Sequence, residues 1–479
     1  MITFSIALLL LIVGYFVYGA FVERVFKPDY NKETPAVVHP DGVDYLPLPT
    51  WKIFMIQFLN IAGLGPIFGA IMGAKFGTAS YLWIVFGTIL AGATHDFLAG
   101  MISLRNDGES LPEIIGRYLG KTVKKVFGIF TIILMVLVGA VFVSGPAELL
   151  AGMTPDFYTP MFWIIAIFIY YVLATLLPID KIIGNFYPIF AMALIFMALG
   201  ILVMLYIKMP ALPEMWNSFG TKYETTPIFP MMFISLACGA ISGFHATQSP
   251  LMARCMTQVK HGRPIFYGAM VTEGIVALIW AAAATYFFSE NGIIDAQGNA
   301  FSGAKVATII SNDWLGITGG ILAMLGIVAA PITSGDTALR SARLIVADFI
   351  GIEQKSILKR LMVSVPIFLA TIGILWYSIS DKDGFGIIWR YFAWCNQALS
   401  VFTLWSITVY LVYEGRNYII TLLPALFMTA VCTSYLCVAP ECINISNENG
   451  IMGYIIGCSA AVIAGVLFII WKKKYESNK

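Results

Sequence analysis

Thirteen stretches of about 20 mostly apolar residues, separated by short polar segments, run along the chain. Each is long enough to cross a hydrocarbon core of roughly 30 Å as a helix. The pattern therefore predicts an all-α polytopic membrane protein with about 13 transmembrane helices. The expected spans are residues 1–22, 51–73, 77–104, 126–152, 160–178, 187–208, 228–253, 264–288, 314–337, 359–378, 387–412, 417–438 and 451–471.

Two of these spans are interrupted by residues that do not suit a continuous helix. The first is broken at AGLGP, residues 62–66, and the second at GAISGFH, residues 239–245. Unwound backbone inside a bilayer is tolerated only where it lines a protein cavity or binds something. A pair of such breaks in corresponding places indicates a secondary transporter with its site near the membrane centre.

Counting spans predicts the organisation. Residues 51–208 and 228–412 each hold five spans and each begin with the interrupted one, and an odd number of spans gives the second set the opposite topology. An extra helix and an inner loop (1–50) precede them, and two helices with a basic tail (417–479) follow. By analogy, this is a 5+5 inverted repeat of the leucine-transporter type.

Composition and charge support the membrane assignment. Of the residues, 59% are hydrophobic and 12% are charged, against about 25% charged in soluble domains. The first span lacks a basic leader and a clean cleavage site, which predicts a retained helix. The net charge of +2 gives no reason to expect nucleic acid.

The placement of basic residues predicts the orientation. Alternating spans leave six of the 29 Lys and Arg outside, which favours an outer N-terminus and a cytoplasmic C-terminus. The six are Lys75, Lys208, Lys222, Lys305, Lys382 and Arg390. Whether Cys437 and Cys442, beside one outer loop, form a disulfide is open.

Several motifs resemble the carbon starvation protein A family over nearly the whole chain. The string ISGFHATQSPLMAR (241–254) is the most specific, and the others are TPA (34–36), DG (41–42), IAGLGPIFG (61–69), HDF (95–97) and WRYFAWCNQ (389–397). The resemblance implies bacterial inner-membrane carriers induced on nutrient shortage. It also implies peptide uptake and, in some members, proton-coupled pyruvate uptake.

The chain departs from that family in two places. Longer members carry additional C-terminal membrane segments, and they tend to have a histidine pair just before the first break, where this chain has MIQF at residues 55–58. A substrate or ion that depends on those histidines cannot be transferred to this chain.

The first break is a candidate substrate site. Gly63 and Gly65 allow unusual backbone angles, and Pro66 suits the first turn of a new half-helix. The half-helix that starts there would direct a partial positive charge at a carboxylate. Close helix packing with a kink is the alternative explanation.

The second break adds polar candidates. Ser242, Gly243, His245 and Gln248 lie in an otherwise apolar span. His245 suits contact with a substrate carboxylate or proton relay, because its charge changes near neutral pH. A packed, hydrogen-bonded histidine is the alternative.

A sodium site is a further hypothesis. Thr333 and Ser334 occupy the position where leucine-transporter-like folds supply hydroxyls, and carbonyls of Ala62 and Gly65 would complete an oxygen shell. Many relatives of that fold that do not use sodium keep small polar residues there, so both coupling by Na⁺ and coupling by H⁺ remain open.

Acidic residues in spans are costly and usually functional. Asp96, Glu273 and Asp336 are therefore candidates for proton coupling together with His245. For Asp96, a structural ion pair with Arg105 is the alternative, and Asp336 has the alternative of capping a helical extension over residues 336–350.

These features predict an importer of a small organic nutrient, pyruvate or a short peptide, driven by H⁺ or Na⁺. We expect no cofactor and no enzyme activity, because no nucleophile, metal or cofactor motif converges. A channel or a nutrient sensor on a transporter scaffold is the alternative. Membrane lipid surrounds the protein, and its oligomeric state is open.

Overall fold

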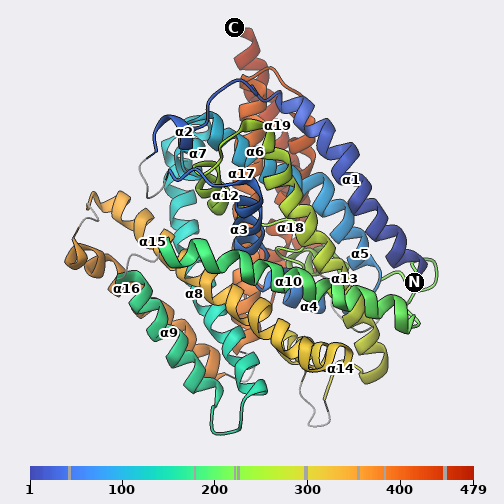
Figure 1. Ribbon diagram of the computed structural model, residues 1–479. Coiled ribbons are helices and arrows are strands. Elements are labelled where there is room, and N and C mark those ends of the chain that lie inside the picture. The colour runs from blue at the N-terminus through green and yellow to red at the C-terminus, as the bar shows by residue number, and fades with distance from the viewer. Residues whose placement is uncertain are drawn as a thin grey trace.

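The computed structural model describes residues 1–40, 45–176, 180–220, 223, 227–295, 300–352, 356–381, 384–445 and 450–478. The motif residues Asp41 and Gly42 and the basic residues Lys222 and Lys382 lie outside this set. Across the described residues the chain is almost entirely helical, with two isolated β-bridges besides (Figure 1).

The first part of the chain, up to residue 208, contains long helices and one interrupted helix. The elements are α1 (Ile2–Phe26), α2 (Pro35–Val38), α3 (Thr50–Ala62), the π-helical turn η1 (Gly65–Gly69), α4 (Ala70–Ala74), α5 (Ala79–Leu82), π-helical η2 (Trp83–Gly92), α6 (Ala93–Arg105), α7 (Leu111–Leu119), α8 (Lys121–Met153), α9 (Pro160–Leu176) and α10 (Asp180–Lys208).

The second part also begins with an interrupted helix. Its elements are η3 (Ile228–Met232), α11 (Phe233–Ser235), α12 (His245–Ala253), η4 (Val259–His261), η5 (Arg263–Tyr267), α13 (Gly268–Asn291), α14 (Gly303–Ala323), η6 (Met324–Val328), α15 (Ala329–Ile350), α16 (Ile357–Ser380), α17 (Gly384–Tyr413), α18 (Ile419–Val438) and α19 (Ile451–Ser477).

The predicted multi-pass architecture is confirmed. By length and composition, ten helices in the described part of the chain can cross a membrane, or eleven when a bent pair counts as one span. That pair is Thr50–Ala62 with Gly65–Ala74, bent by 52°. The predicted number of 13 spans and the inverted symmetry of the two halves stay predictions.

Both expected breaks are present in the structure. At the first, Gly63 has φ 7° and ψ −131°, far from helical values, and Pro66 follows as the second residue of η1. At the second, residues 236–244 separate α11 from α12. Cys238 there has φ +74°, and Ala237 and Ile241 form an isolated bridge.

Some boundaries differ from the sequence prediction. The span expected at 314–337 is part of a helical run from 303 to 350, interrupted at Gly316, where φ is 58°. Hydropathy missed the first turns because they are amphipathic. The predicted helical extension over 336–350 is confirmed as the end of α15. The inner loop expected within residues 1–50 contains the short helix α2.

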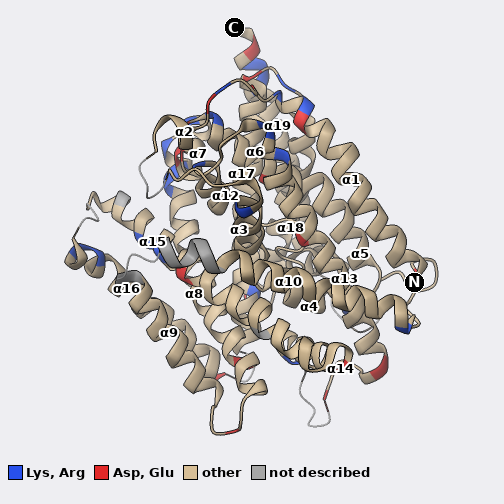
Figure 2. Ribbon diagram, in the orientation of Figure 1, with Lys and Arg blue, Asp and Glu red and all other residues tan. Residues whose placement is uncertain are grey.

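Exposed apolar side chains cover the outermost helices. Phe16 and Val17 on α1 and Val462 and Leu467 on α19 are exposed, as expected of surfaces that face lipid. Figure 2 shows many of the Lys and Arg residues near the end of the molecule where the C-terminus lies, around α2 and α7. Cys437 and Cys442 are not joined by a disulfide, and burial with the charge of Glu441 raises the pKa of Cys442 to about 11.

Candidate functional site

The two breaks pack directly against each other in the interior. An ideal Cβ on Gly65 would lie 2.1 Å from Cβ of Cys238, and one on Gly69 would lie 3.0 Å from the carbonyl oxygen of Ala237. Both glycines are buried. Glycine is therefore required here for the close approach of the two unwound segments, beyond its freedom of backbone angle.

Asn396 on α17 supplies the hydrogen bonds that the second break lacks. Its Oδ1 accepts from Oγ of Ser242 at 3.0 Å and from the backbone N–H of Phe244 at 2.8 Å. Its own carbonyl accepts from the N–H of Gly243 at 3.1 Å, and its Nδ2 donates to Sγ of Cys238 at 3.0 Å. Asn396 thus satisfies two backbone N–H groups of the break, that of Phe244 with its side chain and that of Gly243 with its carbonyl.

Thr88 in η2 is a second hydrogen-bond partner of the unwound segment. Oγ1 of Thr88 in η2 donates to the carbonyl oxygen of Gly239 at 3.2 Å. Sequence reasoning missed both Thr88 and Asn396. The signal for Asn396 was its place within the motif at 389–397, but its partners lie about 150 residues away and could not be read from spacing.

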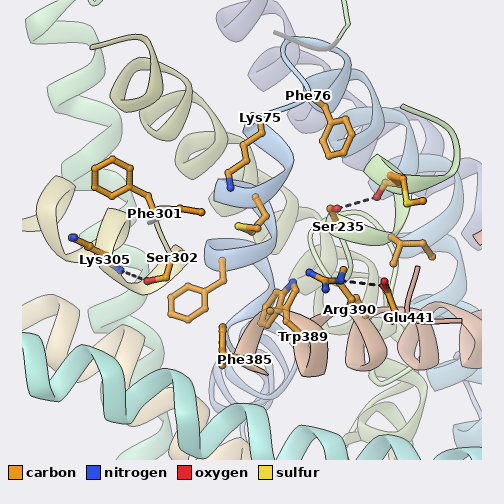
Figure 3. Close-up of a pocket in the computed structure, with 18 of the residues that line it drawn as sticks. Lys75, Phe76, Ser235, Phe301, Ser302, Lys305, Phe385, Trp389, Arg390 and Glu441 are labelled. Atoms are coloured by element: carbon orange, nitrogen blue, oxygen red, sulfur yellow. Dashed lines mark hydrogen bonds and ion pairs between the residues drawn. The ribbon is translucent and has the colours of Figure 1, made fainter. Parts of the chain in front are cut away.

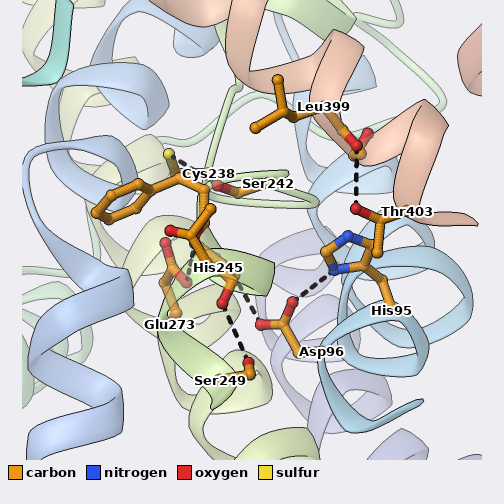
Figure 4. A network of polar contacts seen from close by, with 12 residues as sticks. His95, Asp96, Cys238, Ser242, His245, Ser249, Glu273, Leu399 and Thr403 are labelled. Atoms are coloured by element: carbon orange, nitrogen blue, oxygen red, sulfur yellow. Dashed lines mark hydrogen bonds and ion pairs between the residues drawn. The ribbon is translucent and has the colours of Figure 1, made fainter. Parts of the chain in front are cut away.

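Asp96 lies between two histidines at the end of the second break (Figure 4). Nδ1 of His95 donates to Oδ1 of Asp96 at 2.8 Å, and Nδ1 of His245 donates to Oδ2 at 2.9 Å. All three side chains are fully buried. The pairing of Asp96 with Arg105 that the sequence left open does not occur, because Arg105 contacts Tyr410 and Glu414 instead.

Glu273 on α13 approaches the other face of His245. Its Oε2 lies 3.4 Å from Nε2 of His245, and its side chain is also fully buried. Within the described structure, neither carboxylate oxygen of Glu273 has a hydrogen-bond partner. Buried polar atoms without partners are uncommon and call for a functional explanation.

The order Glu273, His245, Asp96 joins three elements that are distant in the chain. Asp96 is on α6, His245 is the first residue of α12, and Glu273 is on α13. Two carboxylates in an apolar interior repel each other and lose hydration, so the cluster favours states in which protons offset its negative charge. An imidazole between two carboxyl groups can pass a proton from one to the other.

The remaining residues predicted at the breaks are enclosed by protein. A Cβ on Gly63 would lie 2.7 Å from the ring of Phe142, and one on Gly243 would lie 2.4 Å from the backbone nitrogen of Ser400. Nε2 of Gln248 donates to Oγ1 of Thr247 at 3.0 Å. Pro66 is buried. The structure therefore places these residues around the network, and their contact with substrate stays a prediction.

The hydroxyls proposed for sodium lie on α15. Oγ1 of Thr333 donates within its own helix, to the carbonyls of Ala329 and Ala330 at 3.1 and 2.7 Å. Oγ of Ser334 is buried and has no hydrogen-bond partner among the residues that the structure describes. Phe142 contacts both Gly63 and the neighbouring Gly335. Ala62 is also buried.

Asp336 lies apart from the central network. It is buried, and its Oδ2 is 3.7 Å from a guanidinium nitrogen of Arg340 one turn further along α15. The hydroxyl of Tyr187 on α10 donates to the carbonyl of Thr333, which is on α15 with Asp336. No group of three or more His, Cys, Asp or Glu side chains suited to a metal ion occurs in the described part of the chain.

The chain is similar over most of its length to one family of known proteins. The family model of carbon starvation protein CstA matches residues 1–155, 150–318 and 288–435. An uncharacterised membrane protein of Haemophilus influenzae is 38% identical over 362 residues, which cover 65% of this chain and 98% of that protein.

Several relatives carry functional names, two of which are a peptide transporter and a pyruvate/proton symporter. The peptide transporter CstA of Helicobacter pylori is 27% identical, with 88% of this chain and 79% of that protein covered. The pyruvate/proton symporter BtsT of Escherichia coli is 29% identical over 339 residues, which cover 57% of this chain and 47% of that protein.

Solved structures with the same fold are also transporters. A manganese transporter of Eremococcus coleocola matches with a TM-score of 0.56 and 13% identity, covering 91% of this chain and 98% of that one. A Na⁺-coupled sialic acid symporter matches with a TM-score of 0.55 and 14% identity, covering 98% and 97%. At these identities the likeness describes the fold alone.

Proposed function

We propose that this chain, which belongs to the carbon starvation protein CstA family and is a secondary transporter, imports pyruvate or a short peptide together with protons. The named relatives support these two substrates. The placement of the basic residues favours a cytoplasmic C-terminus, and membership of the family is the ground for import across a bacterial inner membrane.

The observation that carries the choice of protons is the position of His245 between Asp96 and Glu273. Nδ1 of His245 is 2.9 Å from one carboxylate, and Nε2 is 3.4 Å from the other. All of these groups are shielded from solvent. Ionisable groups in this setting are expensive unless they exchange protons or bind a partner.

The proton step follows from the atoms. A protonated Glu273 gives its proton to Nε2 of His245, and the ring releases the proton on Nδ1 to Asp96. One proton then moves from α13 to α6, and the ring is left as the other tautomer, which a ring rotation or the reverse exchange resets. His95, which also contacts Asp96, stabilises the ionised form of that carboxylate.

Proton transfer is coupled to movement because the network joins the two predicted halves. Asp96 belongs to the half at residues 51–208, and His245 and Glu273 belong to the half at 228–412. Protonation of Asp96 weakens its charge-assisted bond to His245. Rocking of one half against the other then becomes easier, which is what alternating access requires.

Uptake into proteoliposomes tests the proposal. Labelled pyruvate, a dipeptide and a tripeptide are each offered under an imposed proton gradient and then under an imposed sodium gradient. We expect one substrate class to accumulate with the proton gradient and to be insensitive to sodium. Accumulation with sodium alone, or no accumulation of any of these substrates, would contradict the proposal.

The substitution Asp96→Asn tests the coupling itself. We expect proton-driven accumulation to fall about 100-fold, the range for loss of a proton-transfer group, while exchange of labelled for unlabelled substrate continues. The matched control is Asp156→Asn in the exposed loop between α8 and α9. If Asp96→Asn still accumulates substrate up a proton gradient, Asp96 has no part in coupling.

A further inference from the structure

A pocket of about 670 Å³ opens beside both breaks, on the side where the predicted outer loops lie. Its inner wall comes from the segments next to the breaks: Phe68 in η1, Met72 in α4, and Ile234 and Ser235 in α11. Pockets of about 300 to 1,000 Å³ with apolar walls and a few polar groups are typical of small-molecule sites.

The pocket collects basic residues that are scarce on this side. Of the six Lys and Arg predicted outside, three line it, namely Lys75, Lys305 and Arg390. The acidic residues Glu148, Asp295 and Glu441 line it as well. Charges of both signs in one cavity suit a ligand that carries both signs.

The charges are gathered at two ends. At one end Oγ of Ser302 donates to Oε1 of Glu148 at 2.5 Å, and Nζ of Lys305 donates to Asp295 at 2.9 Å. At the other end Nε of Arg390 donates to Oε1 of Glu441 at 3.1 Å. Figure 3 shows Lys305 and Ser302 on one side of the pocket, Arg390 and Glu441 on the other, and Phe385 and Trp389 between them.

The guanidinium of Arg390 is accessible to a ligand in the pocket, whereas the carboxylate of Glu441 is enclosed by protein and already accepts hydrogen bonds. The Arg390 side chain is 40% exposed, whereas that of Glu441 is 7% exposed. Glu441 also accepts a hydrogen bond from Tyr435 at 2.5 Å. A planar guanidinium is well suited to a carboxylate.

The wall between the two ends is aromatic. The ring centroids of Trp389 and Phe68 are 6.0 Å apart, and those of Trp389 and Phe385 are 6.2 Å apart. Aromatic surfaces of this kind bind apolar groups of a ligand. One water takes about 30 Å³ in the liquid, and pyruvate has roughly the volume of a few waters. Pyruvate would therefore fill a small part of the pocket and could contact the charged residues at one end only.

We propose that this outer pocket is a binding site for a short zwitterionic peptide, with its carboxylate on Arg390 and its ammonium on Glu148. The inference rests on the proposed transport function and adds an outer site that the peptide occupies before alternating access moves it inward. Binding loosens Arg390 from Glu441 and places the peptide side chain against Trp389.

Equilibrium binding of a labelled dipeptide with an aromatic side chain to the purified full chain tests the site. We expect Arg390→Gln and Glu148→Gln each to weaken binding at least tenfold, and pyruvate to compete poorly. The matched control is Arg117→Gln, an exposed arginine on α7, a helix with no residue among those that line the pocket, which should bind as the unaltered chain does.

Capped ligands test the same proposal without any change to the protein. A dipeptide with an acetylated amino end, and another with an amidated carboxyl end, should each bind at least tenfold more weakly than the zwitterion. Equal binding of a doubly capped dipeptide would overturn the proposal. So would loss of binding in Lys75→Gln with full binding in Arg390→Gln.

The central substitution separates the two proposals. Asp96→Asn should lose proton-driven accumulation and still bind the dipeptide in the outer pocket. Peptide binding that depends on Arg390 and Glu148 without any proton-driven uptake would uphold the pocket and reject proton coupling. Proton-driven uptake that is indifferent to both pocket residues would reject the pocket and uphold the coupling.

Discussion

The first interrupted helix bends across Gly63 and Leu64 and carries no polar side chain there, whereas the second is open over residues 236–244 and leads into His245. At the first break the glycines face Phe142 and Cys238 at distances that leave no room for a side chain. At the second, Asn396 and Thr88 bind the unwound backbone.

The first break therefore has a role in packing, and the second has a role in the chemistry of the site. The first break allows two segments to cross closely, and the second break uses that space to place His245 between two carboxyl groups. Breaks in matching positions of the chain therefore need not have matching roles. Substitutions at each break should differ in kind: those at the second alter ion coupling, and those at the first alter stability and packing.

The largest effect is expected for His245→Ala. Removal of the imidazole separates Asp96 from Glu273 and leaves two buried carboxyl groups without the relay. We expect proton-driven uptake in proteoliposomes to fall about 100-fold or more, while the purified protein still elutes as a folded particle.

The control for His245→Ala is His39→Ala, at an exposed position after α2. It should transport at the normal rate. Ordinary uptake kinetics in a folded His245→Ala protein would remove the relay and, with it, the contrast between the two breaks.

Much of this contrast is visible in the sequence, because Gly, Pro and clustered polar residues are unusual inside apolar spans. The two breaks and the separate importance of Asp96, His245 and Glu273 can be predicted in this way. Their contact cannot, since Asp96 and His245 are 149 residues apart. Helical periodicity describes one segment at a time and says nothing of which faces meet.

The outer pocket and the role of Asn396 were also beyond sequence reasoning. Pocket residues range from Phe68 to Glu441, and they come from segments that are far apart in the sequence. Asn396 reads as one polar residue in an apolar helix. Its function appears only when α17 packs against the second break.

The next largest effect is expected for Gly65→Ala. The added Cβ would lie 2.1 Å from Cβ of Cys238, so the two breaks must move apart. Overpacking of a tight core costs about 1–3 kcal/mol, and we expect a value near the upper end, measured as a lower midpoint of thermal unfolding in detergent.

The matched control for Gly65→Ala is Gly373→Ala on α16, where nothing lies within 4 Å of the added Cβ. It should be neutral or slightly stabilising, because alanine favours the helix. Equal stability of the two variants would mean that the breaks do not pack as closely as the structure has them.

A smaller loss is expected for Asn396→Leu. The change leaves the N–H of Phe244 without its acceptor, and one orphaned buried donor costs about 1–3 kcal/mol. The hydroxyl of Ser242 loses Asn396 but keeps its contact with Sγ of Cys238. The midpoint of thermal unfolding should fall. Asn291→Leu, at the exposed end of α13, should show little change, and an equal shift in both would argue that Asn396 does not hold the second break.

The smallest effect is expected for the double substitution Thr333→Ala and Ser334→Ala. If the first break contributes packing alone, its carbonyls bind no ion, and uptake by the double variant should be as insensitive to sodium as uptake by the unaltered chain. Ser334 has no hydrogen-bond partner among the described residues, so loss of its hydroxyl should alter stability by less than about 1 kcal/mol. If the unaltered chain shows a sodium-dependent rise in the unfolding midpoint and the double variant loses it, an ion binds at Thr333 and Ser334, with the carbonyls of Ala62 and Gly65 as its expected further ligands. In that case the first break binds an ion as well as packing against the second, and the proposed difference between the roles of the two breaks is wrong.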